Sequence, residues 1–121
     1  MADIATQETN RLIASDRVDG TTVYNRQGEK LGTIRNFMVD KRSGKAEYAV
    51  LQFGGLFGIG SDYYPIPWDM LDYETDQGGY VVDIDKTRLE GAPRYGEQEP
   101  VYDHGYGREV YGYWGVPYPF I

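Results

Sequence analysis

The chain has 121 residues, with 19 acidic and 12 basic side chains and a formal net charge of −7. This length suffices for one ordinary domain and is too short for two. A net negative charge disfavours binding to phosphate backbones and anionic lipid head groups, so we expect no nucleic-acid partner. The sequence contains no cysteine, which excludes a disulfide framework, a thiolate nucleophile and Cys-ligated zinc.

Residues 1–11 are polar and show no hydrophobic periodicity, so we expect a flexible N-terminal arm. This segment lacks the basic and apolar regions of a secretory signal. No stretch approaches the roughly 20 apolar residues that a helix needs to span a bilayer. These features predict a cytoplasmic protein without a membrane span.

Short apolar runs then alternate with turn residues. We expect a single helical turn ending at Val18, a strand at 22–25 and a long strand at 30–40. Gly28 suits the turn between the two strands because glycine adopts a positive φ without steric cost. The apolar alternation changes phase within the long strand, which predicts a β-bulge at Gly32.

The central strand is apolar on both faces. Along residues 48–53 two sets of side chains alternate, and both sets are largely apolar, which indicates a strand inside a barrel or between two layers. The strand after the next reversal contains Pro65 and Pro67, which remove N–H donors from one side only. That strand is therefore expected at a sheet edge or a barrel seam.

Two further strands, at 71–74 and 80–85, precede a helical turn at 86–90 that Asp85 is expected to cap. Several short strands at close intervals are typical of an all-β fold that closes its sheet so that few edges stay exposed. We therefore predict a small β-barrel of about six strands, with helix confined to single turns.

From Gly96 onwards the composition shifts to tyrosine, glycine and proline, and no helical period fits. We predict a C-terminal tail at 96–121 that lies outside the barrel and becomes ordered only when it docks on something. The expected organisation is an arm at 1–11, a barrel domain at 12–95 and this tail.

Short motifs between Val18 and Tyr95 occur in the order of a known family. They are Val23-Tyr24-Asn25, Gly28-Glu29-Lys30-Leu31-Gly32, Phe37-Met38-Val39-Asp40 before Gly44, Phe53-Gly54-Gly55, Gly58, Gly60, Ile66-Pro67-Trp68, Gly79-Tyr80-Val81-Val82, Leu89 and Ala92-Pro93. Together they resemble the PRC-barrel domain, the module found in the photosynthetic reaction centre H subunit and in a ribosome maturation factor. The stand-alone bacterial members are the most similar.

The resemblance implies a small, strongly bent β-barrel that docks on other proteins. It supplies no catalytic residues that could be transferred to this sequence. We accordingly predict no catalytic residues, no cofactor and no metal ligands, and we expect a non-enzymatic protein.

The loop at 54–60 is rich in glycine but does not fit a nucleotide site. The glycine order differs from the dinucleotide fingerprint, and no Lys-Ser/Thr pair completes a phosphate loop. Leu56, Phe57 and Ile59 are instead large apolar residues with almost no polar company. They either cover the barrel mouth or form a contact surface, most simply one masked by a dimer.

The polar candidates have plain structural explanations. Asp83 and Asp85 point the same way on a strand, and a solvated face plus a helix cap accounts for both. His104 is the only histidine, so neither a catalytic triad nor a histidine metal site can be built around it. Trp68 is expected to fill the core of a small barrel.

Aromatic side chains in the tail are predicted to carry an interface, since tyrosine and tryptophan are enriched at interaction hot spots. The candidate contact residues are Leu56, Phe57, Ile59, Tyr111, Tyr113, Trp114, Tyr118 and Phe120.

The predicted function is protein docking, with self-association into a homodimer or higher homo-oligomer and a protein partner whose identity the sequence does not give. One alternative is a small-ligand or metal-binding sensor that uses the barrel mouth. Another is a disordered tail that only keeps chains apart.

Overall fold

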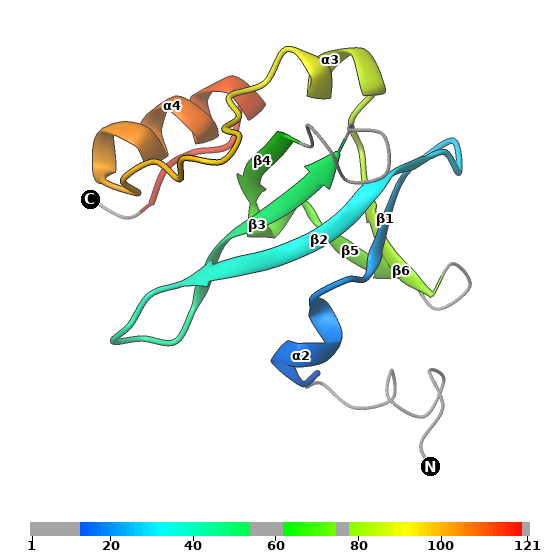
Figure 1. Ribbon diagram of the computed structural model, residues 1–121, viewed down its shortest axis with the longest axis horizontal. Helices are drawn as coiled ribbons and strands as arrows, with labels where there is room; N and C mark the ends of the chain where they lie inside the picture. The colour runs from blue at the N-terminus through cyan, green and yellow to red at the C-terminus, as the bar shows by residue number, and fades with distance from the viewer. Residues whose placement is uncertain (1–12, 54–61, 75–77, 120–121) are drawn as a thin grey trace.

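The computed structural model describes residues 13–53, 62–74 and 78–119 (Figure 1). Six strands form one sheet in the order β4-β3-β2-β1-β6-β5. The strands are β1 (Thr22–Asn25), β2 (Lys30–Val39), β3 (Ala46–Phe53), β4 (Asp62–Pro67), β5 (Asp72–Glu74) and β6 (Gly79–Val82). The predicted number of strands is confirmed.

The sheet is mixed. β1 and β6 pair in parallel, whereas the other neighbouring strands pair antiparallel. β4 and β5 are the two edges, and no hydrogen-bonded pairing joins them within the described parts of the chain. The mostly-β fold is therefore confirmed, and closure of the predicted barrel is not seen. The position of β4 at an edge agrees with its two prolines.

The predicted bulge is present beside Gly32. Val23 lies opposite Gly32 and Tyr24 opposite Lys30, so one residue of β2 has no partner across the pair. A Cβ atom at Gly32 would lie 2.2 Å from the backbone oxygen of Gln52. Only glycine permits this approach of β3, and the bulge lets β2 bend across the sheet.

Four helical segments accompany the sheet within the described residues. They are α2 (Ser15–Val18), the 3-10 turn η1 (Trp68–Met70), α3 (Lys86–Glu90) and α4 (His104–Trp114). The prediction that helix is confined to single turns is wrong, because α4 has 11 residues. The Asp103 carboxylate accepts a hydrogen bond from the Tyr106 N–H at its start, and Gly115 ends it with φ 71°.

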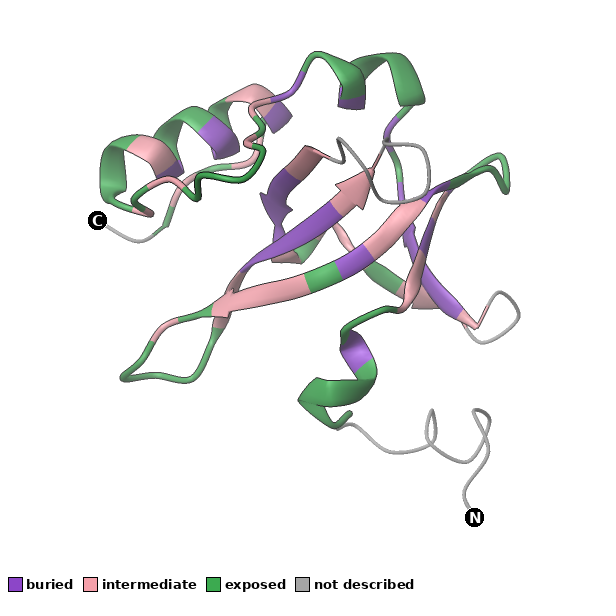
Figure 2. Cartoon of the chain, in the orientation of Figure 1, coloured by how far each residue is buried: buried purple, intermediate pink, exposed green. Residues whose placement is uncertain are grey.

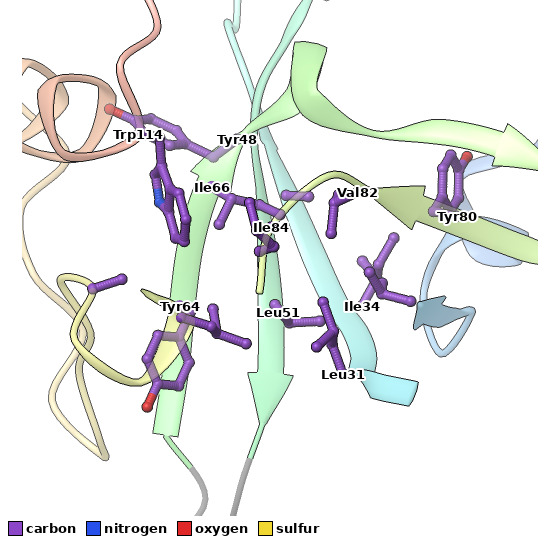
Figure 3. Packing of buried hydrophobic residues seen from close by; sticks show 14 of the residues in the cluster. Leu31, Ile34, Tyr48, Leu51, Tyr64, Ile66, Tyr80, Val82, Ile84 and Trp114 are labelled. Carbon is purple, nitrogen blue, oxygen red and sulfur yellow. The ribbon is translucent and has the colours of Figure 1, made fainter. Parts of the chain in front are cut away.

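One buried cluster joins the sheet to the helices (Figure 3). Leu31, Ile34 and Leu51 come from the central strands, and Leu89 and Val110 from α3 and α4. The buried segments include the middle of β3, most of β4, all of β6 and one side of α4 (Figure 2). The molecule is thus a sheet with a helical segment packed against it.

β3 lies between layers, as its sequence predicts. Tyr48, Ala49, Val50 and Leu51 are all buried, although neighbours along a strand face opposite sides. The Tyr48 ring contacts the rings of residues that follow Tyr95. Leu51 lies on the opposite face of β3, beside its cross-strand partner Ile34. The second layer is therefore supplied by the C-terminal segment.

Candidate interaction surface

α4 packs along β4, at one edge of the sheet (Figure 1). Its buried positions include Val110, Tyr111 and Trp114, which lie on one side of the helix because i, i+1 and i+4 share a face. An edge strand that contains prolines cannot pair fully with another strand, and a covering helix is a common solution. Residues 104–114, which were expected in a tail outside the barrel, therefore form a helix that docks on the edge of the sheet.

Tyr111 is fixed inside the chain. Its ring meets that of Tyr48 edge-on at 5.7 Å, and its hydroxyl donates a 2.6 Å hydrogen bond to the backbone oxygen of Glu47. Burial raises the pKa of the Tyr111 phenol above its usual value. Tyr111 and Trp114 expose 3% and 7% of their surface, so the prediction that they contact a partner is wrong. Their apolar area already completes the core.

Tyr113 stays half-buried and is held by α3. The Arg88 guanidinium lies 5.1 Å from the centroid of the Tyr113 ring and donates a hydrogen bond to the Tyr113 backbone oxygen. The Tyr113 hydroxyl in turn donates to the backbone oxygen of Arg88. This reciprocal contact ties α3 to the end of α4 and leaves part of the ring at the surface.

Tyr118 is half-buried because the chain folds back after Gly115. A Cβ atom at Gly107 would lie 2.4 Å from the Tyr118 ring, so the ring rests directly on the helix backbone. The Tyr118 hydroxyl lies 2.8 Å from Nδ1 of His104. His104 is exposed as expected, but it is the first residue of α4 and does not lie apart from any scaffold.

The other candidates, Leu56, Phe57, Ile59 and Phe120, lie outside the described residues. The described strands do fix where the glycine-rich loop is attached. β3 and β4 pair to their ends, with Phe53 opposite Asp62. The Phe53 ring meets that of Tyr64 edge-on at 5.8 Å, so the loop begins and ends beside an aromatic pair.

The remaining sequence candidates take structural roles. Trp68 is half-buried, with its ring 5.6 Å from Phe37 and 5.8 Å from Tyr80, and so packs against the core without being sealed in it. Asp85 caps α3, as predicted, by accepting a 2.7 Å hydrogen bond from the Arg88 N–H. Asp83 is exposed.

Among the described residues, no His, Asp and Glu side chains gather in a group of three or more that could hold a metal ion. No helix in this part of the chain is long and apolar enough to cross a membrane. Sequence reasoning did miss Arg35 and Asn36, which line a surface cavity with Tyr63 and Tyr95.

Similarity to known proteins covers the part of the chain that forms the sheet. A family model described as the PRC-barrel domain matches residues 11–89, which span all six strands and most of α3. An uncharacterized protein from Deinococcus radiodurans is 26% identical over 76 residues. The aligned region covers 63% of this chain and 27% of the relative, so the chain spans about a quarter of that protein's length.

Proposed function

The chain belongs to the PRC-barrel family, and on that basis we propose that it is a non-enzymatic docking module that binds protein, first of all a second copy of itself. The observation that carries this proposal is the family match over residues 11–89. Domains of this family dock on other polypeptides, which supports a binding role for this chain. A single histidine and no cysteine also leave few groups for nucleophilic chemistry.

The glycine-rich loop is the first part of the proposed contact surface. In the sequence, Leu56, Phe57 and Ile59 are three large apolar residues between the paired ends of β3 and β4. Burial of apolar side chains is the main driving force of protein association, and each buried large side chain contributes about 1.5–3 kcal/mol. These three residues are therefore the proposed apolar anchors for a second copy.

The half-buried tyrosines are the second part. Tyr113 is held by Arg88, and Tyr118 rests on Gly107, so both rings are ordered before any partner arrives. Ordered side chains lose less conformational entropy on binding than mobile ones do. Tyr111 and Trp114 take no part in the proposed surface, because they are buried in the core.

Sedimentation equilibrium of the full chain over a range of concentrations tests the proposal. We expect a dimer or larger species that dissociates on dilution, and a dissociation constant at least about tenfold higher for Phe57→Ser, since a large apolar anchor is lost. Val101→Ser is the matched control, because Val101 is 78% exposed and lies away from the loop in sequence.

A full chain that stays monomeric at every concentration would refute self-association. Equal effects of the Phe57 and Val101 substitutions would remove the loop from the proposed surface.

A further inference from the structure

A surface cavity of about 300 Å³ lies between β2, β4 and the residues that follow Tyr95. Its volume is at the lower end of the range for small-molecule sites, which is about 300–1,000 Å³. Two kinds of charge line it. Arg35 contributes a guanidinium, and Glu97 and Glu99 contribute carboxylates.

Arg35 is presented to the cavity by an irregularity in β2. The register moves from Ile34 opposite Leu51 to Asn36 opposite Val50, so Arg35 has no partner on β3. Bulges of this kind redirect a side chain and are frequent beside functional sites.

The Arg35 guanidinium lies 4.2 Å from the centroid of the Tyr63 ring. The ion pairs formed among the described residues involve Arg26 and Arg94 and leave Arg35 out. Arginine has five N–H donors in a planar fork, which bind a carboxylate in a bidentate manner. These donors are therefore available to an anionic group in the cavity.

Glu97 and Glu99 supply the opposite charge. Their exposed side chains line the same cavity, and carboxylates accept hydrogen bonds only. These two residues therefore suit a cationic N–H group of a ligand.

We propose that this cavity binds a small zwitterion of the free amino-acid class. The ligand carboxylate pairs with Arg35, and the ligand ammonium group faces Glu97 and Glu99. A ligand that carries only a negative charge would be repelled by the two carboxylates. A ligand that carries only a positive charge would be repelled by the guanidinium. Tyr63 and Tyr95, with ring centroids 5.6 Å apart, form a wall for an apolar side chain.

Titration of the full chain with L-leucine and L-phenylalanine, followed by calorimetry and by amide NMR shifts, tests this site. The N-acetyl form of each amino acid lacks the ammonium charge, and the carboxamide form lacks the carboxylate. We expect saturable binding of the zwitterion and at least about tenfold weaker binding of each analogue, since each loses charge-assisted hydrogen bonds. No saturable binding of either amino acid up to about 10 mM, or equal binding of the analogues, refutes the proposal.

Variants separate the site from general effects. Arg35→Gln is expected to weaken binding at least about tenfold, whereas Arg42→Gln, on the exposed turn after β2, leaves it unchanged.

Equal effects of the two arginine substitutions would count against the site. These experiments use small molecules on the full chain, so their failure leaves the docking proposal standing.

Discussion

Tyr106 and Tyr111 bury their phenol groups in different ways. The Tyr111 hydroxyl donates to the Glu47 backbone oxygen at 2.6 Å, whereas the Tyr106 hydroxyl is buried without a partner in the described part of the chain. The two residues lie on the same helix, and each ring contacts another tyrosine. Loss of one oxygen atom should therefore have opposite effects at the two positions.

Tyr106→Phe is expected to raise the free energy of unfolding by about 1 kcal/mol, because an unsatisfied buried hydroxyl is removed. Tyr111→Phe is expected to lower it by about 1 kcal/mol, because a buried hydrogen bond is lost and the Glu47 carbonyl is left without that donor. Urea denaturation of both variants measures these two changes in the free energy of unfolding. Destabilisation of similar size in both would show that the Tyr106 hydroxyl is satisfied.

The glycines of α4 differ at the scale of the helix. Gly107 lies beneath the Tyr118 ring, whereas at Gly112, apart from its chain neighbours and its own helix backbone, no atom of the described residues lies within 4 Å of the position that a Cβ atom would take. Both positions are inside the helix. The two glycines thus separate intrinsic helix propensity from the packing of the segment that folds back after Gly115.

Gly112→Ala is expected to stabilise the fold by about 0.5–1 kcal/mol, as alanine is the better helix former. Gly107→Ala gives the same increase in helix propensity, but its methyl group displaces the Tyr118 ring. The gain in stability should therefore be smaller, and the Tyr118 NMR resonances should shift. Equal stabilisation with unmoved Tyr118 resonances would contradict the observed packing.

The sequence predicted the elements with strong local signals. Pro65 and Pro67 placed β4 at an edge, Gly32 marked the bulge, and Asp85 marked the start of α3. The parallel pairing of β1 with β6 left no local signal, because it joins strands far apart in the chain. The bulge at Arg35, and with it the cavity, was likewise visible only in the register of two paired strands.

α4 was missed for a different reason. Gly105, Gly107 and Gly112 lower the helix propensity of the segment, and its polar and aromatic residues hide the apolar face. The helix gains its stability from tertiary burial of Val110, Tyr111 and Trp114, which a local pattern does not weigh. The available signal was the face of β3 that carries Tyr48. This face is apolar and needed a covering layer, which no other predicted element supplied.

The whole molecule carries many tyrosines whose phenols are shielded from water. Burial raises the pKa of Tyr48, Tyr102 and Tyr111, and it raises that of Tyr106 to about 12. Tyrosine in an unfolded chain titrates near pH 10. Between these values the unfolded chain releases phenol protons that the folded chain retains, so stability falls as pH rises.

The full chain is therefore expected to keep its stability up to about pH 10 and to lose it progressively towards pH 12. The pH dependence should be shallower in Tyr106→Phe, which lacks one of the shifted groups. Urea midpoints measured between pH 8 and pH 12 check this expectation. Identical slopes for the two proteins would mean that the Tyr106 phenol titrates normally in the folded state.

Residues 96–119 form a layer of the folded domain and do not hang free as a contact arm. A chain that ends at Tyr95 loses Val110, Tyr111 and Trp114 from the core and uncovers Tyr48. The most direct measurement is the free energy of unfolding of this shortened chain beside that of the full chain.

We predict a loss on the order of 5 kcal/mol, since each buried large side chain contributes about 1.5–3 kcal/mol, and this is a large share of a typical domain's stability. Equal stability of the two chains would contradict the account.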